Sequence, residues 1–365
     1  MSKLLEFVKE NKNWKEVLSA KPYCLKIKEE GNYVLFMYNQ LDSDFYNPIV
    51  KEARGIILSF AGKEPRVVCR AFDKFANYGE GYADDIDWST AVAQEKIDGS
   101  IIKLWCDENQ WHISTNACID AFKNTPSNFN KSFGEIFSTV FTADKYQLLD
   151  PDYTYMFELV SPYNRVVINY GETAVYALGK RNNKTEKEEP ITEELGVKRP
   201  QYYTFESLEK CILSASVMNF DREDDPEEEG YVVVDKNYHR IKVKSPAYVA
   251  KHHLVTKNPS LEDLIRVYLN NENEEFLTYF PGYHTQLTKV IYYFYDVNYY
   301  LFKAMVEWDR VGRDRKEFAR LYSSHPFSKY FFDAIDSGDW SIKRVKSLPI
   351  PDLARYIKNF YREGI

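Results

Sequence analysis

The period of the hydrophobic pattern changes once along this chain of 365 residues. Up to about residue 250, short runs in which apolar and polar residues alternate are separated by turn residues, a pattern that is typical of strands. After Asn258 and Pro259, apolar residues recur at every third or fourth position, which is typical of amphipathic helices. The change predicts an α+β protein with two domains, a strand-rich one over residues 1–250 and an all-helical one over residues 251–365.

Seven alternating runs predict strands in the first region, and two further stretches predict helices. We expect strands at Tyr33–Tyr38, Gly55–Ser59, Ser100–Cys106, Tyr153–Val160, Ala174–Leu178, Tyr231–Asp235 and Arg240–Ser245, and helices at Leu4–Glu10 and Phe133–Phe141. In the second region, Ser260 is placed to cap a helix over Leu261–Leu269. A long helix is expected from about Tyr283 to Arg310, and a last one begins near Pro351 and ends before Gly364.

Composition and charge argue against several classes of protein. The formal net charge of −7 does not suit a protein held on nucleic acid by overall positive charge, so any phosphate site has to be a local cluster of basic residues. None of the five cysteines falls in a C-x-x-C pair, which argues against a zinc site and a disulfide framework and fits reduced thiols in the cytoplasm. Because no run of about twenty apolar residues occurs, we expect no membrane-spanning segment.

Lys96 stands where a lysine amine can act as a nucleophile. The stretch Glu95-Lys96-Ile97-Asp98-Gly99-Ser100 reads as a strand end, a tight Asp-Gly turn and the start of the next strand. A protonated amine is a poor nucleophile, and neighbouring cations or a metal ion would lower its pKa from the usual value of about 10.4. A nucleophilic Lys96 therefore predicts further positive charges close by. Alone, the motif is short enough to recur by chance, and a plain hairpin explains it as well.

Two lysines on one strand can supply those charges. In Arg240–Ser245, the alternation of a strand places Lys242 and Lys244 on one face and the aliphatic Ile241 and Val243 on the other. The arrangement suits a phosphate-binding wall backed by core residues. Taken alone, it is better explained by a half-buried strand whose lysines face water.

Two glutamates stand within or before apolar strands. Glu158 interrupts Tyr155–Val160, and Glu229 precedes Tyr231–Val234. Since an unpaired carboxylate is costly to bury, each needs either a core ion pair or a cavity that holds a cation or a ribose hydroxyl. Upstream, Arg54 can grip a phosphate bidentately. Together with the three lysines, these residues predict a nucleotidyl-transfer pocket.

The motifs, in this order, resemble the phage RNA ligase 1 family of the covalent nucleotidyltransferase superfamily, which includes ATP-dependent ligases and capping enzymes. The resemblance covers roughly residues 20–250 and is carried by Glu52–Ile57, Ala71–Phe75, Lys96–Ser100, Phe157–Val167, Glu229–Val233 and Ile241–Ser245. The V-S-P-x-N-R sequence within the fourth element is specific to this family. The resemblance implies a nucleotidyltransferase (adenylation) domain of antiparallel sheets with flanking helices, and a C-terminal domain that sets RNA specificity.

The resemblance also implies an activity and a set of site residues. The activity is that of an ATP-dependent RNA ligase, which joins RNA 5′-phosphate and 3′-hydroxyl ends through a lysyl-AMP and an RNA-adenylate and requires Mg²⁺. Lys96 would carry the AMP, Lys242 and Lys244 would contact its phosphate, and Asp98 would assist later steps. The other implied ATP-binding residues are Arg54, Lys74, Glu95, Glu158, Tyr176 and Glu229, of which Glu158 and Glu229 also hold metal. A core position explains Tyr176 equally well.

Two regions are expected to contact RNA. Family members usually show a Ser-Lys-Gly or Thr-Arg-Gly type element after the lysine motif, where this chain reads Ile113-Ser114-Thr115-Asn116-Ala117. The basic residue is missing, which leaves Asn116 to hydrogen-bond a ribose. In the C-terminal region, Arg313 and Arg315 belong to a basic cluster that can follow an RNA backbone. Because acidic residues are interleaved, a solvated helix face is an equal explanation.

Three other functions fit parts of the pattern. A DNA ligase or a capping guanylyltransferase usually carries an OB domain after the last motif, where this chain looks helical instead. A non-catalytic RNA-binding protein on a ligase fold would not need the intact lysines and glutamates. The resemblance finally implies a monomer that repairs RNA, such as a nicked tRNA, in the cytoplasm of a phage-infected cell.

Overall fold

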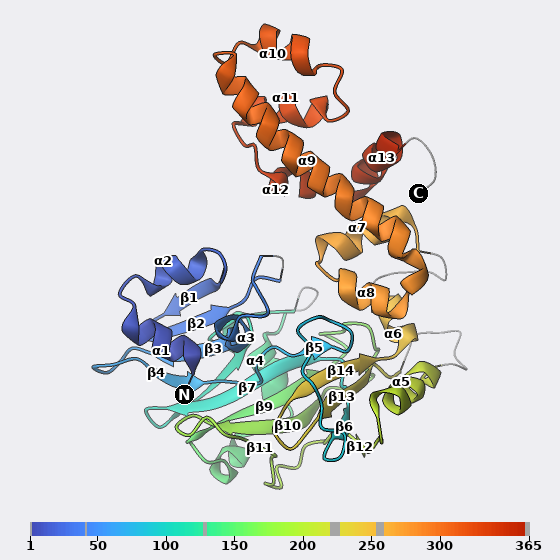
Figure 1. Ribbon diagram of the computed structural model, residues 1–365. Helices are drawn as coiled ribbons and strands as arrows, with labels where there is room; N and C mark the ends of the chain where they lie inside the picture. Colours follow the sequence, from blue (N-terminus) through green and yellow to red (C-terminus); the bar gives the residue numbers. More distant parts are fainter. Residues whose placement is uncertain (1, 41, 127–129, 220–226, 253–258, 362–365) are drawn as a thin grey trace. The chain divides into compact units, whose positions relative to one another are not determined.

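The computed structural model describes residues 2–40, 42–126, 130–219, 227–252 and 259–361 of the chain (Figure 1). It divides into two compact units, Met1–His252 and His253–Ile365. The first unit contains all the strands of the described residues and the second contains helices only, so the expected α+β class is confirmed. The boundary expected after residue 250 falls inside helix α6 (Pro246–His252), and Asn258 lies outside the described residues.

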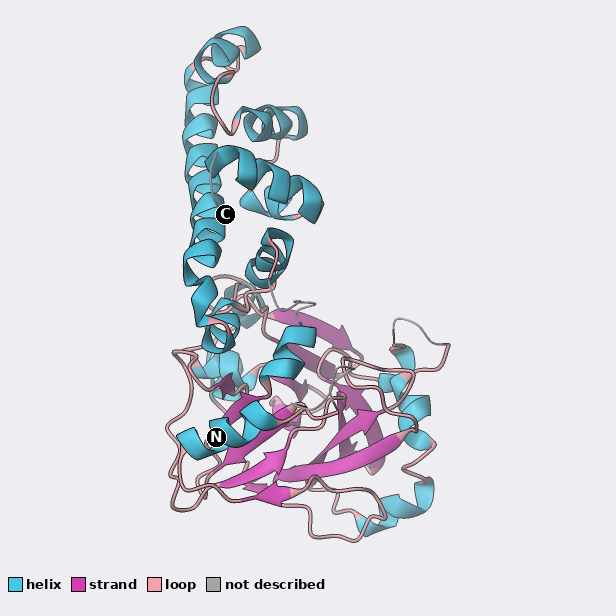
Figure 2. Ribbon diagram, turned by 90° about the vertical axis from the view of Figure 1, so that its right-hand side faces the viewer, coloured by secondary structure: helices cyan, strands magenta, loops and turns pink. Residues whose placement is uncertain are grey.

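Three sheets build the first unit (Figure 2). The first has the order β1-β2-β3-β4, with strands Lys26–Glu30, Tyr33–Met37, Arg54–Ser59 and Arg66–Cys69. The second has the order β11-β10-β9-β7-β8, in which β7 to β11 are Ser100–Asp107, Gln110–Thr115, Tyr153–Val160, Ala174–Asn182 and Glu188–Glu189. The third has the order β12-β6-β13-β14-β5, with β5 at Ala76–Asn77, β6 at Val92–Glu95, β12 at Tyr202–Tyr203, β13 at Gly230–Val234 and β14 at Arg240–Lys244.

The strand pairing is antiparallel as expected, with one exception. Among the described strands, β14 pairs with β5 in parallel, through Ile241 opposite Ala76 and Lys242 opposite Asn77. Strand β5 is a two-residue edge strand far from β14 in the sequence, and such a long connection permits parallel pairing where a hairpin does not. The pairing also brings the segment after β4 alongside the strand that carries Lys242.

Helices cover one face of each sheet. Helices α1 (Lys3–Glu10), α2 (Trp14–Ser19) and α3 (Pro48–Glu52) share a core with the first sheet. Helix α4 (Phe133–Ser138), with the short 3-10 helices Ala121–Lys123 and Ala143–Leu148 nearby in the sequence, packs on the second sheet, and α5 (Leu208–Val217) packs on the third. Residues from the second and third sheets also line a common polar cavity.

The helical unit forms its own core around one long helix. Its helices are α7 (Leu261–Leu269), α8 (Asn273–Tyr279), the 3-10 turn Pro281–Tyr283, α9 (His284–Arg310), α10 (Arg315–Tyr322), α11 (Ser328–Ser337), α12 (Ile342–Lys346) and α13 (Ile350–Tyr361). As expected, the Ser260 side chain caps α7 by accepting a hydrogen bond from the Asp263 N–H. Helix α9 buries one stripe of side chains, whereas its Ile291 and Trp308 are only partly buried; the stripe consists of Leu287, Val290, Tyr293, Phe294, Val297, Leu301 and Ala304.

Candidate active site

A polar cavity of about 350 Å³ lies between the second and third sheets. This volume is within the range of small-molecule pockets, about 300–1,000 Å³. Its walls come from segments that are far apart in the sequence, namely Arg54, Phe72, Phe75, Gln94, Glu95, Lys96, Ile97, Gly99, Ile101, Asn116, Glu158, Leu178, Val232, Arg240, Lys242 and Lys244. Seven of the residues singled out from the sequence therefore line one cavity, because strand pairing places their side chains on the same side.

Lys96 lies at the end of β6, where the chain leaves the third sheet. Its backbone N–H donates to the carbonyl oxygen of Gly230 at 2.8 Å, which fixes the lysine beside β13. The Lys96 Nζ lies 2.7 Å from Oε2 of Glu229, and the lysine side chain is 21% exposed at the cavity. The amine is thus accessible to a ligand but is held in an ion pair when the cavity is without one.

The hairpin of β13 and β14 explains why Glu229 and the two lysines meet. Gly230 pairs with Lys244 and Val232 with Lys242, so alternate residues of β14 reach the cavity while Ile241 and Val243 enter the core. The Lys244 Nζ lies 4.0 Å from Oε1 of Glu229. The face assignment of the lysines is confirmed, and Glu229 sits between Lys96 and Lys244.

Glu158 faces the same cavity from β9 of the second sheet. Burial raises the pKa of its carboxyl to about 7, the nearby Lys96 and Arg54 oppose this rise, and the negative charge of Glu229 adds to it. Burial likewise raises the pKa of Glu229 above its usual value. Two carboxylates that repel each other in a poorly solvated cavity would both gain from a bound cation.

The cavity can be tested as a magnesium site from its own donors. No group of three or more His, Cys, Asp or Glu side chains suited to a metal ion occurs among the described residues. Mg²⁺ characteristically uses only one or two protein carboxylates and takes its other ligands from water and substrate phosphates. Glu158 and Glu229 meet that requirement, so the donor set fits a metal that arrives with a nucleotide.

Two buried polar atoms at the Arg54 end of the cavity have no hydrogen-bond partner among the described residues. They are Nη1 of Arg54 and Oδ1 of Asn116. The Arg54 guanidinium lies 5.0 Å from the ring centroid of Phe75, which orients it without satisfying its N–H groups. Since buried polar groups are normally paired, this end of the cavity is arranged for a ligand that accepts a hydrogen bond from Arg54 and donates one to Asn116.

Asp98 is not among the residues that line the cavity, and its expected part in the later steps stays a prediction. Its Oδ2 accepts hydrogen bonds from the backbone N–H groups of Val167 at 2.8 Å and Ile168 at 2.7 Å, and its Oδ1 accepts one from the Tyr248 hydroxyl at 2.8 Å. The carboxylate is therefore fully used as an anchor for other segments.

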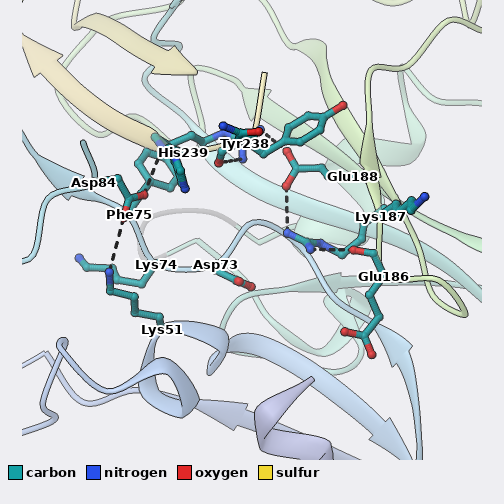
Figure 3. A pocket seen from close by; sticks show the side chains of 13 residues that line it. Lys51, Asp73, Lys74, Phe75, Asp84, Glu186, Lys187, Glu188, Tyr238 and His239 are labelled. Carbon is teal, nitrogen blue, oxygen red and sulfur yellow. Dashed lines mark hydrogen bonds and ion pairs between the residues drawn. The ribbon is translucent and has the colours of Figure 1, made fainter. Parts of the chain in front are cut away.

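Lys74 also lies outside this cavity. It lines a second hollow with Lys51, Asp84 and His239, and the adjacent Phe75 lines both (Figure 3). The Lys74 Nζ lies 5.3 Å from the ring centroid of Tyr38 and 5.0 Å from that of Phe45. Neighbouring side chains in an extended segment point to opposite sides, so the position that faces the nucleotide cavity is taken by Phe75.

Glu95 and Tyr176 differ in their relation to the cavity. Glu95 lines it, and one carboxylate oxygen accepts a hydrogen bond from the Gln201 N–H at 3.2 Å. Tyr176 pairs directly with Glu158 across β9 and β10, but it is not among the cavity residues. It packs against Ile97 and Val160, which agrees with the alternative of a core tyrosine.

Arg313 and Arg315 lie in the helical unit, each in a surface ion pair. The Arg313 Nε lies 3.0 Å from Asp309 Oδ1, and the Arg315 guanidinium pairs with Asp336. Arg320 pairs with Glu317 in the same way. The interleaved acidic residues thus neutralise much of the basic cluster, although both arginines are more than half exposed.

Sequence reasoning missed three residues that belong to this region. Arg240 lines the cavity and the hollow of Figure 3, and its guanidinium is held by Glu188 and lies 4.5 Å from the Phe72 ring centroid. Tyr248 of α6 is tied to Asp98. Lys103 is fully buried in β7, directly opposite Ser114 of β8. The sequence could have indicated Lys103, because it is a charged residue within the apolar run Ile101–Trp105, as Glu158 is within its own apolar strand.

A family model described as RNA ligase, of the T4 RNA ligase 1 type, matches residues 52–248. The chain belongs to this family. The match begins just before Arg54 and ends at Tyr248, so it contains every residue of the cavity. The expected resemblance to the phage RNA ligase 1 family is thereby confirmed.

Individual relatives carry the same description. A protein of Autographa californica nuclear polyhedrosis virus, whose name combines polynucleotide kinase and RNA ligase, is 30% identical over 284 residues, which cover 71% of this chain and 39% of that protein. An RNA ligase of Rhodothermus phage RM378 is 26% identical over 322 residues, with 72% and 73% covered. An archaeal ATP-dependent RNA ligase of known structure has 16% identity and a TM-score of 0.42, with 70% of this chain and 64% of that one covered. This chain thus spans about two fifths of the baculovirus relative.

Within the described parts of the chain, no helix is both long and apolar enough to cross a bilayer.

Proposed function

We propose that this chain is an ATP-dependent RNA ligase that uses Lys96 as its nucleophile. The observation that carries the proposal is the meeting, at one cavity, of the Lys96 amine, two further lysines and two carboxylates. Such a set suits the attack of an amine on a phosphate that is held by cations. Membership of the RNA ligase family supports RNA as the substrate.

The proposed reaction has three steps. The Lys96 nitrogen attacks the α-phosphorus of ATP and loses its proton, a P–N bond forms, and the bond to pyrophosphate breaks. An oxygen of an RNA 5′-phosphate then attacks the same phosphorus, which transfers AMP to the RNA and returns the lysine. Finally an RNA 3′-hydroxyl attacks the activated 5′-phosphate, a phosphodiester forms and AMP leaves.

The residues of the cavity divide this work. Lys242 and Lys244 are proposed to hold the α-phosphate, and Lys244 lies close enough to Glu229 to keep that carboxylate oriented. Glu158 and Glu229 are proposed to hold Mg²⁺, which would neutralise the charge that gathers at phosphorus. Before the first step, the ion pair between Lys96 and Glu229 has to open, so that the lysine nitrogen can present its lone pair.

The deciding experiment is intact-protein mass spectrometry after incubation with ATP and Mg²⁺. Wild-type protein is expected to gain one AMP, and Lys96→Ala to gain none. Lys184→Ala serves as the matched control, because Lys184 is an exposed lysine of the same unit that lies outside the cavity. If wild-type protein gains no AMP, a non-catalytic RNA-binding protein on a ligase fold becomes the better explanation.

A second assay distinguishes the ligase classes. Single-stranded RNA with a 5′-phosphate, nicked DNA, and GTP in place of ATP are offered separately. We expect joining of RNA with ATP only. Sealing of nicked DNA would indicate a DNA ligase, and a covalent GMP adduct would indicate a capping guanylyltransferase.

The helical unit is proposed to contribute RNA contacts. Exposed ion pairs are weak, so Arg313 and Arg315 can exchange their carboxylate partners for RNA phosphates at little cost. The exposed side of α9 also carries Tyr292, Tyr295 and Phe302, whose rings can stack on unpaired bases.

We further propose a cytoplasmic monomer that repairs broken RNA such as a nicked tRNA. Its five free thiols suit a reducing compartment.

Substitution of the two arginines tests this role of the helical unit. Arg313→Ala with Arg315→Ala should weaken RNA joining and leave self-adenylation unchanged. Arg355→Ala is the control, since Arg355 is an exposed, ion-paired arginine on another helix of the same unit. The cluster is only a solvated surface if the control weakens joining as much as the double variant does, or if neither protein differs from wild type.

A further inference from the structure

Lys103 is a buried lysine beside the cavity that the proposed reaction does not use. It lies in the middle of β7, with no exposed surface. Its Nζ donates a hydrogen bond to the carbonyl oxygen of Gly55, the residue after Arg54. A Cβ built on Gly55 would lie 2.7 Å from this Nζ and 2.7 Å from backbone atoms of Asn116. Lys103 therefore stands directly behind the Arg54 end of the cavity.

The charge of Lys103 has no carboxylate partner among the described residues. The ionisable groups that act on it are the thiols of Cys69 and Cys118 and the guanidinium of Arg54. Thiols are mostly protonated at neutral pH, and burial raises the pKa of Cys69 further. Burial and the like charge of Arg54 both lower the pKa of Lys103.

A purely structural role does not explain a lysine at this position. The Gly55 carbonyl needs one hydrogen-bond donor, which a neutral side chain could supply without the cost of burying an ammonium group. That cost is several kcal/mol when no opposite charge is near, and Arg54 increases it. A second observation points to a negatively charged ligand. Nη1 of Arg54 is buried without a partner at the end of the cavity that lies next to Lys103.

We propose that Lys103 is a positioning residue for a phosphate group bound at the Arg54 end of the cavity. It fixes the Gly55 carbonyl, and with it the start of β3 that carries Arg54. A bound anion favours the charged form of Lys103, and this buried positive charge then strengthens the field on the anion that Arg54 contacts, because charges act more strongly where water is excluded. The inference rests on the proposed function only for the source of that phosphate, which is either the polyphosphate of ATP or the 5′-phosphate of RNA.

The first test needs no catalysis and uses inorganic tripolyphosphate as the probe. Thermal unfolding of the full chain is followed with and without this anion. It should raise the unfolding temperature of wild-type protein, and this rise should be lost in Lys103→Gln and in Lys103→Met. Gln keeps a donor for Gly55 and removes the charge, whereas Met removes both. An equal rise in all three proteins overturns the proposal.

The unfolding temperatures of the variants without the anion distinguish a positioning role of Lys103 from a role in stabilising the fold. Removal of an unpaired buried charge predicts that Lys103→Gln unfolds at the same temperature as wild type or at a higher one. If both variants unfold at clearly lower temperatures and the Gln variant still responds to tripolyphosphate as wild type does, Lys103 is a structural residue and the proposal fails.

Two activity measurements then distinguish the sources of the phosphate. If ATP is the source, Lys103→Gln should raise the KM for ATP in self-adenylation about tenfold or more, a loss typical of a charged contact, with little change in kcat. If the RNA end is the source, the KM for ATP stays unchanged and joining of 5′-phosphorylated RNA by pre-adenylated protein is impaired instead. If neither changes, the proposal is wrong. Failure of wild-type protein to form any adduct would refute the proposed function, while the tripolyphosphate result would still stand.

Discussion

Replacing Glu158 by glutamine should make the protein more stable while removing its activity. The carboxyl of Glu158 has a pKa of about 7 in the folded protein, against 4.5 as the usual value, chiefly because it is buried. The folded state therefore binds more protons than the unfolded chain between these two values, so wild-type stability falls as pH rises from about 4.5 to 7. At 1.36 kcal/mol for each pKa unit, the full loss above pH 7 is about 3 kcal/mol.

Glutamine has nearly the same shape and no charge, so Glu158→Gln should recover most of that loss at pH 8 and little of it at pH 5. The measurement is urea unfolding of wild type and variant at both pH values, without nucleotide or metal. Glu95→Gln is the matched control, since Glu95 lines the same cavity and its carboxylate already accepts a backbone hydrogen bond. That control is expected to give no gain at pH 8.

The same variant should fail to form the AMP adduct, because it lacks a proposed metal ligand. Two outcomes would refute the view that Glu158 is a carboxylate whose burial destabilises the fold. In one, the Glu158→Gln protein is less stable than wild type at pH 8. In the other, its difference in stability from wild type is the same at both pH values. Loss of activity together with a gain in stability is the signature of a group retained for function.

Three more substitutions or treatments have defined outcomes. Asp98→Ala removes the acceptor of three hydrogen bonds and should lower the free energy of unfolding by about 2–4 kcal/mol, measured by urea unfolding; a change below about 0.5 kcal/mol would contradict its anchoring role. Gly55→Ala should be destabilising by more than about 1 kcal/mol, because φ is +79° and the new Cβ would lie 2.7 Å from Asn116 backbone; wild-type stability and ATP affinity would contradict the close approach. Chelation of divalent metal by EDTA should stop adduct formation, and added Mg²⁺ should restore it; adduct formation in excess EDTA would exclude the proposed metal role of Glu158 and Glu229.

The sequence was sufficient to predict the direction of side chains that follow the alternation of a strand. Lys242 and Lys244 could be assigned to one face because a strand has a period of two, and Gly230 opposite Lys244 then carries Glu229 to the same end of the hairpin. Glu158 could be recognised because a carboxylate within an apolar strand demands a partner. In both cases a local rule determines where the side chain points.

The residues whose surroundings could not be predicted depend on contacts between distant segments. Asp98 follows the nucleophile by two positions, but the N–H groups of 167 and 168 and the hydroxyl of Tyr248 take its carboxylate, and nothing local indicates that. Lys74 and Phe75 lie in a segment without regular structure, so no period determined which of them faces the nucleotide cavity. The parallel pairing of β14 with β5 was likewise invisible, because it joins residues far apart in the sequence.

The buried carboxylates and the buried cations of this cavity would all be stabilised by one kind of ligand. Burial raises the pKa of Glu158 and Glu229, so both carboxylates would be stabilised by a cation between them. At the other end, the unpartnered Nη1 of Arg54 and the buried ammonium of Lys103 would be stabilised by an anion. A metal ion alone would add positive charge near the lysines, and a phosphate alone would add negative charge near the glutamates. A magnesium–nucleotide complex would bring both charges together, so the charge pattern of the cavity favours the complex over either part. Glu229 would also hold the Lys96 amine less tightly if its carboxylate bound the metal ion, because the oxygen that lies 2.7 Å from the lysine nitrogen would then be shared.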